Sequence, residues 1–224
     1  MRQRFYSGWI CLFLALTACK TLESDKATLP QITRDTSIEE AYSAAKIHGS
    51  EILTQVKNLI QDRQQLAQLQ QLSERDLLQN ADKLPQAELL NVAHLYRFSS
   101  PKLSREVFLT LVNSRNETAR QIGWRLAALK PAPDIAQAMD EYLNRSLVDG
   151  REDSVLSSDL AKAIQENSLK SSFTFLVRGL MTQGDPEYAM AMLAIDPTRA
   201  MGPFLDYLAK ADFDDLRQLN QKTV

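Results

Sequence analysis

The amino-acid sequence predicts an all-α fold, built as an antiparallel stack of helices. Apolar residues recur at spacings of three and four along most of the chain after residue 36. No segment shows the strict alternation of apolar and polar residues that indicates a half-buried strand, and seven glycines leave few positions for hairpins. Short turns marked by proline or glycine separate helices of similar length, which favours antiparallel neighbours. An irregular helical bundle is the alternative architecture.

The first predicted helical region begins after Ser37 and extends to about Leu72. Ser37 and Glu40 form a capping-box pattern, in which each side chain bonds the backbone N–H of the other residue. The apolar stripe that follows consists of Ile38, Tyr42, Ala45, Ile52, Val56 and Leu59. We expect one long helix, or two in line, whose narrow stripe packs on a single partner helix. That partner comes from the same domain or from a second copy, which would make residues 37–72 a homo-oligomerisation stem.

Each later helix has a start signal in the sequence. Polar caps bond the backbone N–H groups that a helix start leaves unpaired, and proline in the first turn lacks that N–H group. The predicted starts are Ser73, Pro85, Ser100–Pro101, Asn116, Asp134, Ser154, Ser171 or Ser172, Asp185–Pro186, Asp196–Pro197 and Asp212. The predicted stops are Pro131, the turn Asp149–Gly150, and Gly184.

One pair of these helices resembles a HEAT-like repeat unit. The residues that match are Arg120 near the start of the first helix, Ala128 and Leu129 at its end, and Ile135, Met139 and Leu143 in the second helix. Residues 154–184 and 186–211 resemble later, more degenerate pairs, so the resemblance extends over about half the chain. It implies a short, irregular solenoid, an architecture that serves mostly as a binding scaffold.

The first nineteen residues resemble a bacterial lipoprotein signal. Arg2 and Arg4 precede a short apolar run, which ends in the lipobox Leu-Thr-Ala-Cys at residues 16–19. The run is shorter than the roughly 20 residues that a membrane-spanning helix needs. The resemblance implies that residues 1–18 are removed and that Cys19 is lipidated, which attaches the chain to a membrane. An ordinary secretory signal cut at the same position is the alternative.

The residue after Cys19 is Lys20 rather than aspartate, which by the same resemblance implies the outer membrane, with the domain facing the periplasm. The inner membrane and the cell surface are the other destinations. The predicted organisation is a signal peptide at 1–18, a lipidated N-terminus and linker at 19–36, N-terminal helices at 37–98 and a HEAT-like domain at 99–224.

Cysteine content, charge and motifs exclude several classes of function. The only cysteines are Cys11, in the leader, and Cys19, so the processed chain has no free thiol and no disulfide. Its net charge of −4 is a poor basis for nucleic-acid binding. The sequence contains no His-Glu-x-x-His, Gly-x-Ser-x-Gly, phosphate-loop or dinucleotide motif. We therefore expect no catalytic residues, no metal site, no cofactor and no nucleic-acid partner.

Charge is unevenly distributed along the chain. Residues 94–130 carry a net charge of +5, and residues 131–166 carry −5. Either the two segments pair with each other as solvated faces of adjacent helices, or they form a dipolar surface that orients a partner. In the second interpretation the partner-binding residues are Arg97, Arg105, Arg115, Arg120 and Arg125.

These observations predict a membrane-anchored envelope lipoprotein that acts as a non-catalytic protein-binding scaffold or assembly factor. Secretion, pilus and cell-wall machineries are the expected settings. The predicted partners are the membrane, through the lipid on Cys19, and another envelope protein. A cell-wall enzyme, or a regulator of one, is the alternative function.

Overall fold

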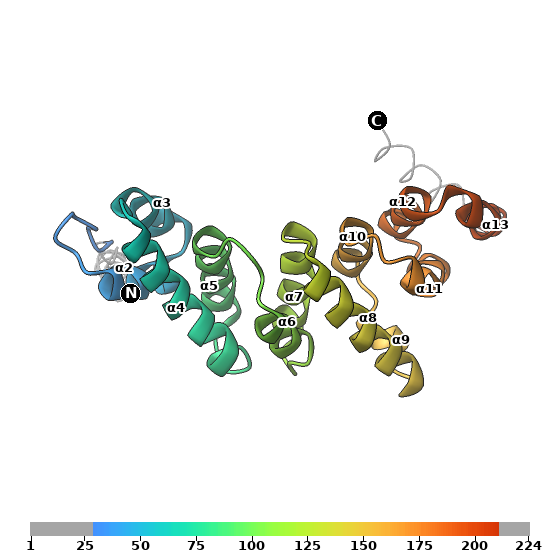
Figure 1. The fold of residues 1–224 in the computed structure, drawn as a ribbon, viewed down its shortest axis with the longest axis horizontal. Helices are drawn as coiled ribbons and strands as arrows, with labels where there is room; N and C mark the ends of the chain where they lie inside the picture. Colours follow the sequence, from blue (N-terminus) through green and yellow to red (C-terminus); the bar gives the residue numbers. More distant parts are fainter. Residues whose placement is uncertain (1–28, 211–224) are drawn as a thin grey trace, which may run out of the picture. The chain divides into compact units, whose positions relative to one another are not determined.

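The computed structural model describes residues 29–210, and this part of the chain is helical throughout, apart from the loops between helices (Figure 1). It contains twelve α-helices, α2–α13, and one short 3₁₀ helix, η2, with no strand in the described range. The all-α prediction is therefore confirmed. The lipobox and the helix start at Asp212 lie outside the described residues. No described helix is both long and apolar enough to span a membrane.

The region expected to hold one long helix, or two in line, instead contains three separate helices. These are α2 (Ile38–His48), α3 (Ser50–Leu59) and α4 (Arg63–Asn80). Gly49 separates the first two, because its φ of 65° lies in the left-handed region that favours glycine. Asp62 begins α4, since its side chain accepts a hydrogen bond from Gln65 N–H. The predicted capping box at Ser37 and Glu40 is confirmed.

The remaining helices follow in short steps. They are α5 (Gln86–Ser99), α6 (Arg105–Val112), α7 (Glu117–Leu129), α8 (Pro133–Val148), α9 (Glu152–Val155), α10 (Ser158–Glu166), η2 (Lys170–Ser172), α11 (Phe173–Gln183), α12 (Pro186–Ile195) and α13 (Pro197–Leu208). Side chains of the predicted caps Asn116, Asp185 and Asp196 bond the first turns of α7, α12 and α13. Gly184 ends α11 in the left-handed conformation, as predicted.

Three predicted helix starts were wrong. Ser73 lies inside α4, where its hydroxyl donates to the carbonyl oxygens of Leu69 and Gln70 instead of capping. The cap of α6 is Ser104 rather than Ser100, and the cap of α10 is Ser157 rather than Ser154. In the last two cases a serine a few residues after the predicted one bonds the first turn of its helix.

The helices pack in two layers. In one layer α3, α5, α7, α10 and α12 each contact the next, and in the other α4 contacts α6 and α6 contacts α8. The pairs α4–α5, α6–α7 and α11–α12 join the layers as antiparallel hairpins (Figure 1). Helix α7 packs most extensively on α6 and α10. Its hairpin partner is therefore α6, rather than α8, the second helix of the HEAT-like resemblance at residues 116–143.

The apolar stripe of the first helices is buried within their own domain. Ile38, Tyr42 and Ile52 are all buried, and a polar network joins α2 to α4 beneath them. The carboxylate of Asp76 accepts hydrogen bonds from Tyr42 Oη at 2.7 Å and Lys46 Nζ at 2.9 Å. Self-association through residues 37–72 would therefore need a surface other than this stripe.

Candidate interaction surface

The five arginines predicted to bind a partner do not share one surface. Arg105 Nη2 lies 2.5 Å from Glu141 Oε2 of α8, and Arg125 Nη2 lies 2.9 Å from Asp159 Oδ2 of α10. Both pairs join the basic segment to the acidic one, as the first interpretation of the charge pattern predicts. Exposed pairs of this kind contribute little to stability, about 0–1 kcal/mol each.

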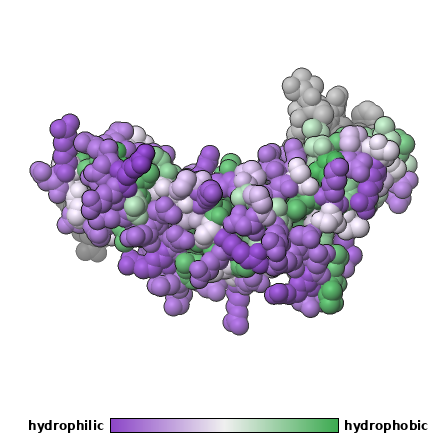
Figure 2. Space-filling model, viewed as in Figure 1, coloured by the Kyte–Doolittle hydropathy of each residue, from purple (hydrophilic) through white to green (hydrophobic). Residues whose placement is uncertain are grey.

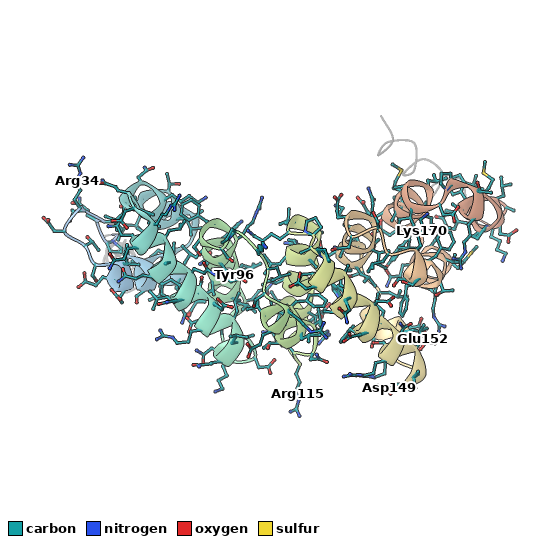
Figure 3. All side chains as sticks on the ribbon, viewed as in Figure 1. Arg34, Tyr96, Arg115, Asp149, Glu152 and Lys170 are labelled. Carbon is teal, nitrogen blue, oxygen red and sulfur yellow. The ribbon has the colours of Figure 1, made fainter. Side chains whose placement is uncertain are left out.

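Arg115 and Arg120 lie at the turn between α6 and α7. Arg120 Nη1 donates to the carbonyl oxygens of Ser114 at 3.1 Å and Arg115 at 3.0 Å, so its side chain closes the turn. Arg115 is exposed and points away from the helices (Figure 3), while its backbone N–H bonds Asp82 Oδ1 at 3.0 Å. This turn lies at the start of α7, whereas Arg125 lies near its end.

Arg97 and Arg125 instead belong to a cluster of basic side chains at the other end of α7. We call this cluster the basic surface; its members are Lys57, His94, Arg97, Arg125 and Lys130. Burial lowers the pKa of His94, and the positive charges of Arg97, Lys57 and Arg125 lower it further. Burial and the charge of Arg97 likewise lower the pKa of Lys130. These basic side chains therefore lie close to one another, and three of them, His94, Arg97 and Arg125, line one pocket.

Helix geometry explains why these residues gather. On α5, Leu90, His94 and Arg97 are spaced by four and three residues, so they share one face of the helix. Arg125 and Leu129 have the same relation on α7, and α5 packs on α7. All five of these side chains line one small pocket between the two helices.

The positive charge of the basic surface is only partly balanced. Within the described part of the chain, Arg125 is the one member that forms a salt bridge. Lys57 lies over the ring of Phe98, 5.5 Å from its centroid, and Lys130 Nζ donates to the carbonyl oxygen of Ser100. Mutually repelling cations with little compensation create a positive potential that attracts an anionic group.

An apolar groove continues from the basic surface. Its volume is about 860 Å³, and its wall includes Leu129 of α7 and Met190 of α12. Leu129 is 45% exposed and Met190 41%, although both are large apolar residues. Lys162 and Glu187, which also line the groove, neutralise each other at 3.5 Å. Figure 2 shows hydrophobic surface over the region of α12 and α13. Leu129 belongs to both the small pocket and this groove, so charged and apolar contacts adjoin.

A second cavity, of about 410 Å³, lies among α8, α9, α11 and α13. Arg178 forms salt bridges there with Glu152 and Asp153, and the guanidinium of Arg199 lies 4.4 Å from the ring centroid of Phe173. Figure 3 shows Glu152 at this end of the molecule. The positive charges of Arg178 and Arg199 are balanced by the negative charges of Glu152 and Asp153. This cavity therefore favours neither an anionic nor a cationic ligand. The basic surface is the stronger candidate.

Sequence reasoning found Arg97 and Arg125 but missed Lys57, His94 and Lys130 as their neighbours. Lys57 lies outside the basic segment, and only the packing of α3 on α5 brings it close. No group of three or more His, Cys, Asp or Glu residues is placed to hold a metal ion within residues 29–210. No protein-family model, curated protein or solved structure matches this chain.

Proposed function

We propose that this protein is a membrane-anchored envelope lipoprotein, which acts as a non-catalytic scaffold by binding another envelope protein. Cys19 would hold the lipid, and the helical domain would face the periplasm from the outer membrane. The lipobox resemblance supports the anchor, and the two-layer helical stack supports the scaffold. Secretion, pilus or cell-wall assembly is the proposed setting.

The basic surface, with its adjoining apolar groove, is the observation on which the scaffold function rests. Binding hot spots are enriched in arginine and aromatic side chains, placed where apolar contacts exclude water. Arg97 and Phe98 are both exposed on α5, and the exposed Leu129 of α7 lines the same small pocket as Arg97. We therefore propose that the partner presents an acidic segment that also contains large apolar residues.

In-cell cross-linking of the tagged, full-length protein tests the proposal. We expect one dominant envelope partner, identified by mass spectrometry, which is lost when Cys19→Ala removes the lipid anchor. Arg97→Glu should also reduce that cross-link, because it reverses a charge in the basic surface. Arg115→Glu is the matched control, since Arg115 is an exposed arginine at the opposite end of α7.

Two results would contradict the proposal. A partner that is retained equally by Arg97→Glu and by wild type would exclude the basic surface as the docking site. Hydrolysis of peptidoglycan by the purified protein would establish the cell-wall enzyme in place of the scaffold.

A further inference from the structure

The basic surface has a complementary segment in this same chain. Residues 212–216 read Asp-Phe-Asp-Asp-Leu, so this short segment contains three carboxylates and two large apolar side chains. The basic surface combines cations with exposed apolar side chains in the same way. Phe98 is 38% exposed and Leu129 45% exposed beside Arg97.

We propose that residues 212–216 of one copy of the protein dock on the basic surface of a second copy. The carboxylates of this acidic segment would pair with Arg97 and Lys57, whose charges have no salt-bridge partner among the described residues. Phe213 and Leu216 would cover the exposed apolar side chains between the cations. The contact also offsets the positive charges of Arg97 and Lys57, which lower the pKa of His94 in addition to the effect of its burial.

Chain length places this contact between copies rather than within one. An extended residue spans at most about 3.6 Å, so Asp215 lies within roughly 18 Å of Lys210, the last described residue. The packing order from α13 to α5 passes through α12, α10 and α7, which is four interhelical steps. At roughly 8–10 Å a step, the distance is on the order of 30–40 Å. The acidic segment is therefore too short to reach Arg97 of its own chain.

Charge also favours the basic surface over the nearer apolar groove as the docking site of the acidic segment. The groove beside α12 contains Lys162, but Glu187 already neutralises it, and Glu166 adds a further negative charge. Three more carboxylates would be repelled there. The same three carboxylates are attracted to the basic surface, where cations predominate.

The contact joins two different surfaces, so two copies form it twice in a reciprocal two-fold dimer, or successive copies form it once each in a head-to-tail series. It also occupies the surface on which we propose that the envelope partner docks. Self-association and partner binding would therefore compete, and an acidic partner would disperse the self-associated form by mass action.

Sedimentation velocity over a range of concentrations tests the inference. A chain from Ile32 to Val224 is suitable, because its described residues, 32–210, belong to one compact unit. We expect the average mass to rise with concentration, and we expect added salt to reverse that rise by screening. Neutralising the three carboxylates with Asp212→Asn, Asp214→Asn and Asp215→Asn should weaken association about tenfold.

Matched variants locate the second half of the contact. Arg97→Glu with Lys57→Glu should weaken association as much as the neutralised acidic segment does, whereas Arg115→Glu should leave it unchanged. Mixing the Arg97→Glu, Lys57→Glu protein with one in which Asp212, Asp214 and Asp215 are all changed to lysine should restore association. Only a direct contact between the two surfaces predicts that restoration.

A monomer at every concentration would overturn the inference, as would self-association that survives neutralisation of the acidic segment. Neither outcome would contradict the proposed scaffold function. That function is tested separately, by the effect of Arg97→Glu on the partner cross-link in cells.

Discussion

Gly179 is the residue where the structure gives the sharpest stability prediction. It lies in α11 against the ring of Tyr188 in α12, and Tyr188 is completely buried. A Cβ added at Gly179 would lie 2.2 Å from Tyr188 Cε1 and 2.3 Å from Cζ. The ring cannot easily swing away, because its hydroxyl is hydrogen-bonded to Gln183 Oε1 at 3.0 Å. Gly179→Ala should therefore force α11 and α12 apart.

The net cost follows from two opposing effects. Overpacking a closely packed core costs about 1–3 kcal/mol, and the 2.2 Å approach places Gly179→Ala at the upper end of that range. Replacing glycine by alanine within a helix returns up to about 1 kcal/mol. We expect the free energy of unfolding to fall by about 2–3 kcal/mol.

Urea denaturation of Gly179→Ala, beside Gly202→Ala, measures this difference. Gly202 lies within α13, and an added Cβ there meets nothing within 4 Å outside its chain neighbours. The gain in helix propensity is opposed by Pro203, which disfavours a helical conformation for a preceding residue with a Cβ, so Gly202→Ala should change stability by less than about 1 kcal/mol. A double variant with Tyr188→Leu should show coupling, because the smaller side chain relieves the clash. If Gly179→Ala proves as stable as wild type, the close packing of α11 on α12 is refuted.

Three further predictions follow from the described contacts. Burial alone would raise the pKa of Asp76, but hydrogen bonds from Lys46, Tyr42 and Asn80 lower it below its usual value. The stabilisation from this carboxylate is therefore complete above about pH 4 and is lost as the pH falls through the lowered pKa. Asp76→Asn should cost about 1–3 kcal/mol at pH 7 and flatten the acid limb of a stability–pH curve. Asn116→Ala should cost about 1 kcal/mol in urea denaturation, since it removes the cap of α7; an unchanged midpoint would count against that cap. An acidic partner should raise the lowered pKa of His94, so its affinity should increase as the pH falls from neutral, and His94→Gln should abolish that dependence in a binding titration.

Much of the fold could be predicted from local signals in the sequence. The caps at Ser37, Asn116, Asp185 and Asp196 act on backbone groups within three residues, so the sequence around them contains the whole interaction. Gly184 could be predicted for the same reason, because the left-handed conformation is a property of that residue.

Other features depend on contacts between distant residues. Ser73 resembles a helix cap in sequence, but it lies inside α4, packed within the domain. Gly49 can be tolerated within a helix, and only the structure shows that its positive φ divides α2 from α3.

The candidate site could be predicted only in part. The charge of the basic segment indicated Arg97 and Arg125. Charge counts along the chain do not show, however, which arginines already form salt bridges or hydrogen bonds within the domain. Arg105 pairs with Glu141, and Arg120 closes the turn before α7. Lys57 joins the site through the packing of α3 on α5, which no local pattern contains.

Site-specific photo-cross-linking in living cells tests the scaffold function most directly. A photoreactive residue placed at Phe98, beside the basic surface, should capture one envelope partner, and Arg97→Glu should suppress that capture. The same residue at Val148 is the control, because Val148 is 87% exposed at the end of α8, away from the basic surface. Capture at Phe98 and not at Val148 is the expected result. Equal capture at both positions, or none at Phe98, would contradict the proposal that this surface binds the partner.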